Sequence, residues 1–401
     1  MTAHPLQGLK VLDLTQFVSG PFCTQILADL GARVVKIERP GSGDPYRNAG
    51  PSFVDGESTL FLSLNRSKES IALNLKSSQG RDIFLHKLLP RFDILVENFS
   101  PGTMESLGIG YDECRKVNAP IIYSGISGFG IKGPMREKKG FDLILQAVSG
   151  IMDLTGESDS EPVKVGVPIT DFAAGLFSAV GILAAVHERH SILEGTKITT
   201  SLYESSVALL SILACDYLAS GNVPHRMGSA SPTFAPYQAF EAKDAYIAVA
   251  GAGSEEMWIR FVQAIDFKEL AKDPRFLMNA DRVKHQKELA DLINGRLRKK
   301  SAEEWLGIFD SQGVPSGLVG TLPEVVINEQ SKALELVGKT PLRNFESKAF
   351  SSVRLPLSFE EQPVVSKVAP PGLGEHTESN LLQAGLTMNE IGELRRNGVV
   401  G

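Results

Sequence analysis

The sequence predicts an α/β protein that has a large Rossmann-like domain with a parallel sheet and a smaller inserted α+β domain. Apolar, strand-like segments alternate with helix-like segments through the first half of the chain. The pattern changes at residues 221–224, which are typical of a linker. The chain has 401 residues, which is long enough for two domains.

The first fifty residues predict a β-α-β unit. Residues 10–15 form an apolar strand-like run, and residues 18–21 are typical of a tight turn in which Pro21 suits the first position of a helix. Residues 22–30 have helical periodicity, and residues 33–37 read as a second strand. The helix would begin just beyond the end of the first strand, a natural place for a phosphate group.

The residues of this unit favour coenzyme A over a nicotinamide cofactor. The glycine fingerprint of NAD-binding proteins is absent, because only Gly20 occupies the turn. Arg39 follows Glu38 at the end of the second strand, and an arginine there suits a phosphorylated ribose, as in NADP or in the 3′-phospho-ADP of coenzyme A. An NADP-binding protein is the low-ranked alternative.

Further alternation extends the sheet. We expect strands at 70–75, 92–96 and 120–124, with helices at about 79–89 and 111–117.

Polar or glycine-rich residues follow three of the expected strands, at 38–39, 97–99 and 125–130. The carboxyl ends of parallel strands meet at one edge of a sheet, where ligands bind. We therefore expect these three segments to form one site.

Residues 163–168 read as a strand, and Thr170 or Asp171 would begin a long apolar helix. One interpretation makes Asp171 the helix N-cap. The other makes it a nucleophile, because the helix dipole would keep the carboxylate ionised and backbone amides would lie nearby to receive an oxyanion. An ionised carboxylate can attack a thioester directly.

The second half suggests the domain boundaries. A strand at 246–250 leads into a glycine-rich loop at 251–253, and charged helices follow. A final helix is expected at about 388–396. We predict an N-terminal part of the large domain at 1–220, an inserted domain at 221–325 and a return to the large domain at 326–401.

Composition excludes several classes of function. The net charge of −6 and the lack of a basic run argue against nucleic acid as a partner. The three cysteines lie too far apart for a disulfide framework or a metal pair, and we expect no metal site.

The sequence also argues against a membrane partner. The apolar stretch 172–186 is shorter than the roughly 20 residues that a bilayer needs, so we expect a core helix there. No secretory signal pattern is visible, so we expect the cytoplasm or an organelle matrix.

Taken together, a series of motifs in order along the chain resembles the class III coenzyme A transferases of the formyl-CoA transferase type. The matching segments are 11–21, 36–44, 65–68, 96–99, 128–130, 140–142, 170–171, 235–240 and 373–377.

The resemblance implies a reaction and a nucleophile. Asp171 would attack an acyl-CoA to give an aspartyl anhydride, coenzyme A would return to give an aspartyl thioester, and an acceptor carboxylate would take over the coenzyme A. It also implies an interlocked homodimer. Coenzyme A and acyl-CoA would be substrates, with no permanently bound cofactor.

The resemblance also assigns binding residues. Arg39 would hold the nucleotide phosphates, and the loop Gly251-Ala252-Gly253 would lie near the acyl group. The remaining residues expected along the adenine and pantetheine path or close to the coenzyme are Gln16, Val18, Leu73, Lys76, Asn98, Phe99 and Lys139.

Departures from the formate and oxalate enzymes narrow the substrate. Val18 stands in place of a glutamine, Ser106 in place of an arginine, and the four-glycine loop is reduced to 251–253. The pattern is more similar to members that use succinyl-CoA and small dicarboxylates.

The related α-methylacyl-CoA racemases need a histidine within 140–142, where this chain has Phe141, which cannot move a proton. Racemisation or isomerisation of an acyl-CoA is therefore the second hypothesis for the function.

Overall fold

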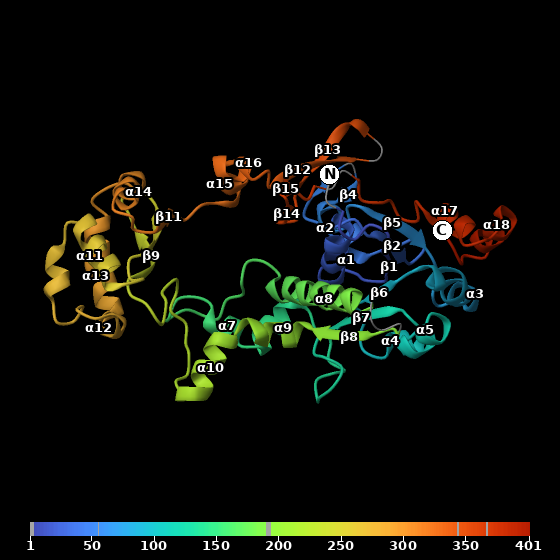
Figure 1. Cartoon of the computed structure of the whole chain (residues 1–401), viewed down its shortest axis with the longest axis horizontal. Helices are drawn as coiled ribbons and strands as arrows, with labels where there is room; N and C mark the ends of the chain where they lie inside the picture. Colours follow the sequence, from blue (N-terminus) through green and yellow to red (C-terminus); the bar gives the residue numbers. More distant parts are fainter. Residues whose placement is uncertain (1–3, 55, 190–193, 343–344, 366–367) are drawn as a thin grey trace. The chain divides into compact units, whose positions relative to one another are not determined.

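The computed structural model describes residues 4–401 except 55, 190–193, 343–344 and 366–367. The chain divides into two compact units (Figure 1). Unit 1 comprises residues 1–151, 165–219 and 329–401, and unit 2 comprises 152–164 and 220–328. Residues 152–164 therefore belong to unit 2, which corrects their assignment to the N-terminal part of the large domain.

Unit 1 is built on a six-stranded parallel sheet in the order β5-β2-β1-β6-β7-β8. The chain builds the sheet outward from β1 in both directions, so the strand order reverses between β1 and β6. This arrangement confirms the predicted Rossmann-like fold. The strands are β1 (Lys10–Asp13), β2 (Arg33–Glu38), β5 (Lys68–Ala72), β6 (Ile94–Glu97), β7 (Ile122–Ser127) and β8 (Lys197–Ser201).

The sixth strand differs from the one we expected. Residues 163–168 form no strand, and β8 pairs with β7 instead. Val163 and Val167 are exposed, and the Val165 amide donates to Gln146 Oε1 at 2.8 Å, a side-chain acceptor. The apolar residues of this segment therefore do not mark a buried strand.

Alternating strand residues supply two cores, one on each face of the sheet. On one face, Val11 lies in a cluster with residues of α1 (Ser19–Asp29) and α8 (Ile169–Glu188). On the other face, Leu12 lies in a cluster with residues of α17 (Thr377–Gln383) and α18 (Met388–Arg396). The second cluster also receives side chains from the helical segment α3 (Ser78–Asp82), Ile83–Leu88 and Leu89–Arg91, and from α5 (Tyr111–Val117).

Helix α8 is long and apolar enough to cross a membrane by length and composition. It packs instead against α1, α9, β7 and β8 within unit 1, and Ala174 and Ile182 are fully buried there.

Shorter elements complete unit 1. The helices are the 3₁₀ turn Pro45–Arg47, α2 (Thr59–Leu64), α4 (Thr103–Ser106), α6 (Asp142–Val148), α9 (Leu202–Leu209), α10 (Ser211–Ser220) and α16 (Glu329–Ala333); α7 (Ile151–Leu154) spans the chain boundary with unit 2. Three antiparallel pairs join β3 (Phe53–Val54) to β4 (Glu57–Ser58), β12 (Val337–Leu342) to β13 (Phe345–Val353), and β14 (Ser358–Phe359) to β15 (Gln362–Pro363).

Unit 2 is an α+β unit with an antiparallel sheet in the order β11-β10-β9. Its core contains the stacked rings of Trp258, Phe261, Phe309 and Trp305. The elements are β9 (Tyr237–Glu241), β10 (Tyr246–Ala250), α11 (Glu255–Ala264), the 3₁₀ segment Lys268–Lys272, α12 (Asn279–Lys284), α13 (Gln286–Leu297), α14 (Ala302–Ser311), β11 (Ser316–Leu318) and α15 (Leu322–Ile327).

Four buried charges lie where β1, β2 and β5 meet the loop that follows β1. Lys68 Nζ lies 3.0 Å from Asp13 Oδ2, and Lys36 Nζ lies 3.0 Å from Asp44 Oδ2. Burial alone would raise the pKa of Asp13, but Lys36 and Lys68, aided by two threonine hydroxyls, lower it to about 2. Burial lowers the pKa of Lys68 to about 8 even though Asp13 opposes the change.

Lys36 also binds the backbone of the β1–α1 loop, and Lys68 binds the backbone of the first turn of α1, which follows this loop. Lys36 Nζ donates to the Thr15 carbonyl at 2.6 Å, and Lys68 Nζ donates to the Pro21 carbonyl at 3.0 Å. Asp13 Oδ1 accepts from the Thr15 amide at 2.9 Å. The four charges, which we call the buried charge cluster (Asp13, Lys36, Asp44 and Lys68), therefore fix the loop at both ends.

Lys68→Met should lower the free energy of unfolding by about 3–5 kcal/mol, because the variant leaves the Asp13 carboxylate buried without its direct partner. Chemical denaturation followed by circular dichroism measures the loss. Arg33→Met is the matched control on the neighbouring strand, because the Arg33–Glu69 pair is partly exposed and should be worth about 1 kcal/mol or less. Equal losses in the two variants would contradict a dominant role for the cluster.

Candidate active site

A cavity of about 510 Å³ lies at the carboxyl edge of the sheet, beyond β1, β6 and β7. Its wall combines the β1–α1 loop, the segment after β6, the end of β7 and the first turn of α8. Two of the three segments that we expected to converge, those after β6 and β7, contribute to it. The lining residues are 16–19, Tyr46, 98–100, 126–128, 139–143, Pro168, Asp171 and Leu202.

Asp171 is the third residue of α8, so the interpretation that it is the helix N-cap is wrong. Asp142 performs the capping instead: its Oδ1 accepts from the Thr170 amide at 3.0 Å and from the Thr170 hydroxyl at 2.9 Å. The Ile169 amide donates to the Val167 carbonyl at 2.8 Å. These first two amides of α8 already have partners, which removes them from the expected set of oxyanion donors. The Asp171 carboxyl is left to line the cavity.

The surroundings of Asp171 raise its pKa. Burial and the nearby Asp142 carboxylate raise the pKa to about 7, while a hydrogen bond from the Ser19 side chain opposes the rise. This corrects the expectation that the helix dipole keeps the carboxylate fully ionised. A carboxyl that lines a cavity and has a strongly raised pKa is a candidate functional group.

The β1–α1 loop is held in an unusual conformation beside Asp171. Phe17 has φ of 63°, in the left-handed region that residues with a side chain rarely adopt. Asn98 stabilises it by a reciprocal pair: the Gln16 amide donates to Asn98 Oδ1 at 2.8 Å, and Asn98 Nδ2 donates to the Gln16 carbonyl at 2.7 Å. The Phe17 amide donates to Asp44 Oδ1 at 3.3 Å. The buried charge cluster therefore reaches the cavity wall through Asp44.

The binding residues predicted from the resemblance divide into four groups. Five line the cavity: Gln16, Val18, Asn98, Phe99 and Lys139. Arg39 and Lys76 have exposed side chains and are absent from its wall. Leu73 is 1% exposed and packs in the core, so its side chain cannot contact a coenzyme, which corrects that assignment as far as the side chain is concerned. The loop Gly251-Ala252-Gly253 follows β10 in unit 2.

Three aromatic rings that we did not assign to binding also line the cavity. The Phe17 ring meets the Tyr46 and Phe141 rings edge to face, with centroid distances of 5.5 Å and 6.0 Å. The pKa of Tyr46 is raised by burial and by the carboxylates of Asp171, Asp44 and Asp142. Tyr46 lies two residues after the Glu38–Asp44 segment in the sequence, and this proximity was the available signal for its place at the site.

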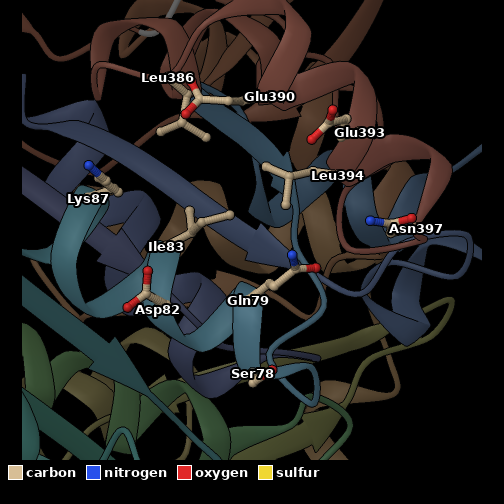
Figure 2. A pocket seen from close by; sticks show the side chains of 10 residues that line it. All are labelled: Ser78, Gln79, Asp82, Ile83, Lys87, Leu386, Glu390, Glu393, Leu394 and Asn397. Carbon is tan, nitrogen blue, oxygen red and sulfur yellow. The ribbon is translucent and has the colours of Figure 1, made fainter.

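A second hollow, of about 560 Å³, lies between the helical segment 78–88 and α18 (Figure 2). Ile83, Leu386 and Leu394 form its apolar floor, and most of the surrounding side chains are polar or acidic. Lys87 is the single cation among its ten lining residues, an unsuitable wall for a polyphosphate. The Asp171 cavity is therefore the candidate active site.

Comparison with known proteins agrees with this geometry. The model of CoA-transferase family III matches residues 6–377. Human succinyl-CoA:glutarate CoA-transferase is 37% identical, and the match covers 99% of this chain and 90% of that protein. The acetyl-CoA:oxalate CoA-transferase of Acetobacter aceti is 39% identical, over 84% of this chain and 86% of that protein.

Solved structures show the same fold. The crystal structure of a CAIB/BAIF family protein from Brucella suis superposes with a TM-score of 0.84 at 34% identity, and the match covers 95% of this chain and 99% of that chain. Together with the Rossmann-like sheet and the carboxyl-lined cavity, these matches show that the chain is an enzyme that belongs to CoA-transferase family III.

Proposed function

We propose that this enzyme transfers coenzyme A from succinyl-CoA, or a similar acyl-CoA, to a small carboxylic or dicarboxylic acid through covalent intermediates on Asp171. The observation that carries the proposal is the Asp171 carboxyl on the cavity wall, whose pKa of about 7 leaves a large ionised fraction at neutral pH. A carboxylate nucleophile needs no general base, because it carries no proton to remove.

The first half-reaction loads the enzyme. An Asp171 oxygen attacks the thioester carbonyl, the carbon–sulfur bond breaks, and coenzyme A leaves as a thiolate. The thiolate then attacks the aspartyl carbonyl of the anhydride and expels the donor carboxylate. The product is an aspartyl–CoA thioester, and no proton is gained or lost.

The second half-reaction reverses these steps with the acceptor. The acceptor carboxylate attacks the aspartyl thioester and expels the coenzyme A thiolate, leaving a mixed anhydride. The thiolate attacks the acceptor's acyl carbonyl, and Asp171 leaves as a carboxylate. Because the overall reaction exchanges one thioester for another, we expect it to run without ATP or a permanently bound cofactor.

The residues around Asp171 support roles in binding. Asn98, Phe99, Gln16 and Val18 line the cavity where the pantetheine arm would lie, with Lys139 close to the coenzyme. Arg39 and Lys76 have exposed cationic side chains, which suits contact with the nucleotide phosphates. We place the loop 251–253 near the acyl group by resemblance alone.

Several relatives support the substrate class. The human and Chloroflexus aurantiacus relatives are named for succinyl-CoA with glutarate and with D-citramalate, respectively. The alternative, an acyl-CoA racemase, requires a proton-transferring residue where Phe141 presents a hydrocarbon ring to the cavity. The racemase therefore remains the weaker proposal.

Unit 1 exposes an apolar surface that supports a homodimer. Leu143 and Val148 on α6, Phe177 and Val180 on α8, and Ile212 and Leu218 on α10 are exposed, the last two by 83% and 80%. Exposed apolar patches of this kind mark protein interfaces. We propose that a second copy of the chain covers this surface, and that the dimer is interlocked and works in the cytoplasm or an organelle matrix.

Intact-protein mass spectrometry after incubation with succinyl-CoA should show a CoA-sized adduct on the wild type and none on Asp171→Ala. The same substitution should lower the transfer rate by at least about 10³-fold, because it removes the group that forms both covalent bonds. A wild type that forms no adduct with succinyl-CoA or with a panel of acyl-CoAs would contradict the proposal, and deuterium exchange at the α-carbon would then test racemisation.

The rate of adduct formation should rise with pH through about 7, because only the ionised Asp171 attacks.

The contribution of Asp171 to the free energy of unfolding should change with pH in the opposite direction. A carboxyl whose pKa is raised on folding binds more protons folded than unfolded, so its contribution falls as pH rises from about 4 to 7. Asp171→Asn should therefore melt higher than the wild type at pH 8, by a few degrees, and the difference should shrink as the pH falls to about 4. A pH-independent difference would contradict the raised pKa.

Sedimentation analysis should give twice the 43.3 kDa mass of the chain. The double substitution Ile212→Lys with Leu218→Lys should increase the monomer fraction, because it places two charges in the apolar surface on α10. Met388→Lys, at an exposed position on α18, is the matched control and should leave the mass unchanged. A monomeric wild type would contradict the dimer.

A further inference from the structure

We propose that Ser19 is a positioning residue for Asp171: its hydroxyl links the Asn98 amide to the Asp171 carboxyl and favours the ionised, attacking form. This inference rests on the proposed role of Asp171 as nucleophile. Ser19 itself forms no bond to the substrate and acts only through Asp171.

Helix packing brings the two residues together. Ser19 is the first residue of α1, it is buried, and it lines the same cavity as Asp171. Gly175 lies on α8 four residues after Asp171, and therefore on the same helix face. A Cβ at Gly175 would lie only 2.6 Å from the Ser19 carbonyl oxygen, so the start of α1 lies against this face of α8.

Neighbouring contacts fix this approach further along the same helix pair. The Phe22 and Phe172 rings meet edge to face at 4.8 Å, and the Cys23 thiol donates to Ser178 Oγ at 3.3 Å. The position of Ser19 relative to Asp171 is therefore set by the packing of α1 against α8.

The Asn98 amide determines what the Ser19 hydroxyl can do. Asn98 Nδ2 donates to Ser19 Oγ at 3.4 Å and to the Gln16 carbonyl at 2.7 Å. A hydroxyl that accepts from an amide keeps its own proton for donation. The proton can go to the Asp171 carboxylate, which lines the same cavity and whose pKa the Ser19 side chain lowers.

The charges around Asp171 make this one donor important. The Asp142 carboxylate at the start of α6 opposes ionisation of Asp171, as does burial. Tyr46 and Lys139, on other parts of the cavity wall, are the remaining titratable side chains that line the cavity. A hydrogen bond donated to the charged form favours that form, so Ser19 should increase the ionised fraction of Asp171 at neutral pH.

The test compares Ser19→Ala and Ser19→Thr with the wild type over pH 5–9. The first readout is the rate of CoA adduct formation from succinyl-CoA. Ser19→Ala should move the acid midpoint of the rate upward by about 0.5–1 pH unit. It should therefore be roughly 3–10-fold slower below the midpoint and close to the wild type at pH 9. Ser19→Thr keeps the hydroxyl and should restore the midpoint.

The second readout needs no catalysis. Each protein is compared with its own Asp171→Asn variant, and the difference in melting temperature is measured as a function of pH. This difference reports the ionisation of Asp171, and the pH at its midpoint should be higher in Ser19→Ala than in the wild type. If the wild type forms no adduct but this midpoint still moves, the proposed reaction fails, while the effect of Ser19 on the ionisation of Asp171 stands.

Ser178→Ala is the matched control, since it removes a buried hydroxyl from the same α1–α8 contact at a distance of two helical turns from Asp171. It should leave both midpoints unchanged, whatever its effect on stability. A Ser19→Ala variant that loses the same factor at every pH, with unmoved midpoints, would overturn the inference and assign Ser19 a packing role alone.

Discussion

The buried charge cluster is the constraint on which the active site depends. Lys36 and Lys68 are held by Asp44 and Asp13 in the interior of unit 1. Lys36 also binds a carbonyl of the β1–α1 loop, and Lys68 binds a carbonyl in the first turn of α1. Buried ion pairs contribute little net stability compared with apolar packing, but removing one partner is costly. The cluster is therefore better explained by the geometry it imposes than by the stability it adds.

The fixed conformation of the β1–α1 loop shapes the wall of the cavity. The loop carries Phe17 in a left-handed conformation, which costs of order 1 kcal/mol or more and persists only when its surroundings enforce it. Asp44 binds the amide of Phe17 itself, and Asn98 binds the backbone of the preceding residue, Gln16. The strain lets the loop turn sharply, so that Phe17 and Val18 line the cavity and α1 begins at Ser19, beside α8.

Opposing effects act on the ionisation of Asp171. The proposed reaction requires an ionised Asp171, but the burial of this carboxyl favours its protonated form. Asp142 strengthens this effect while it caps α8 through Thr170. The carboxylate that caps α8 therefore opposes ionisation of Asp171, whereas the Ser19 side chain favours it.

The sequence by itself determined the parts of the molecule that depend on local periodicity and on linear motifs. Alternation of apolar strands and helices is enough to predict a parallel sheet, because a buried strand and an amphipathic helix have different periods. The order of the motifs was enough to indicate the family and to select Asp171 as the predicted nucleophile. The short, polar strand β8 carries too little apolar signal, and it pairs with β7 only because of where the chain returns.

The tertiary structure alone decided how the side chains of the site act. The N-cap function near residue 171 belongs to Asp142, twenty-nine residues earlier, because hydrogen bonds across space do not follow sequence spacing. Leu73 points into the core, whereas Tyr46 and Phe141 line the cavity. The pKa of Asp171 depends on burial and on neighbours from α1 and α6, which only packing brings together.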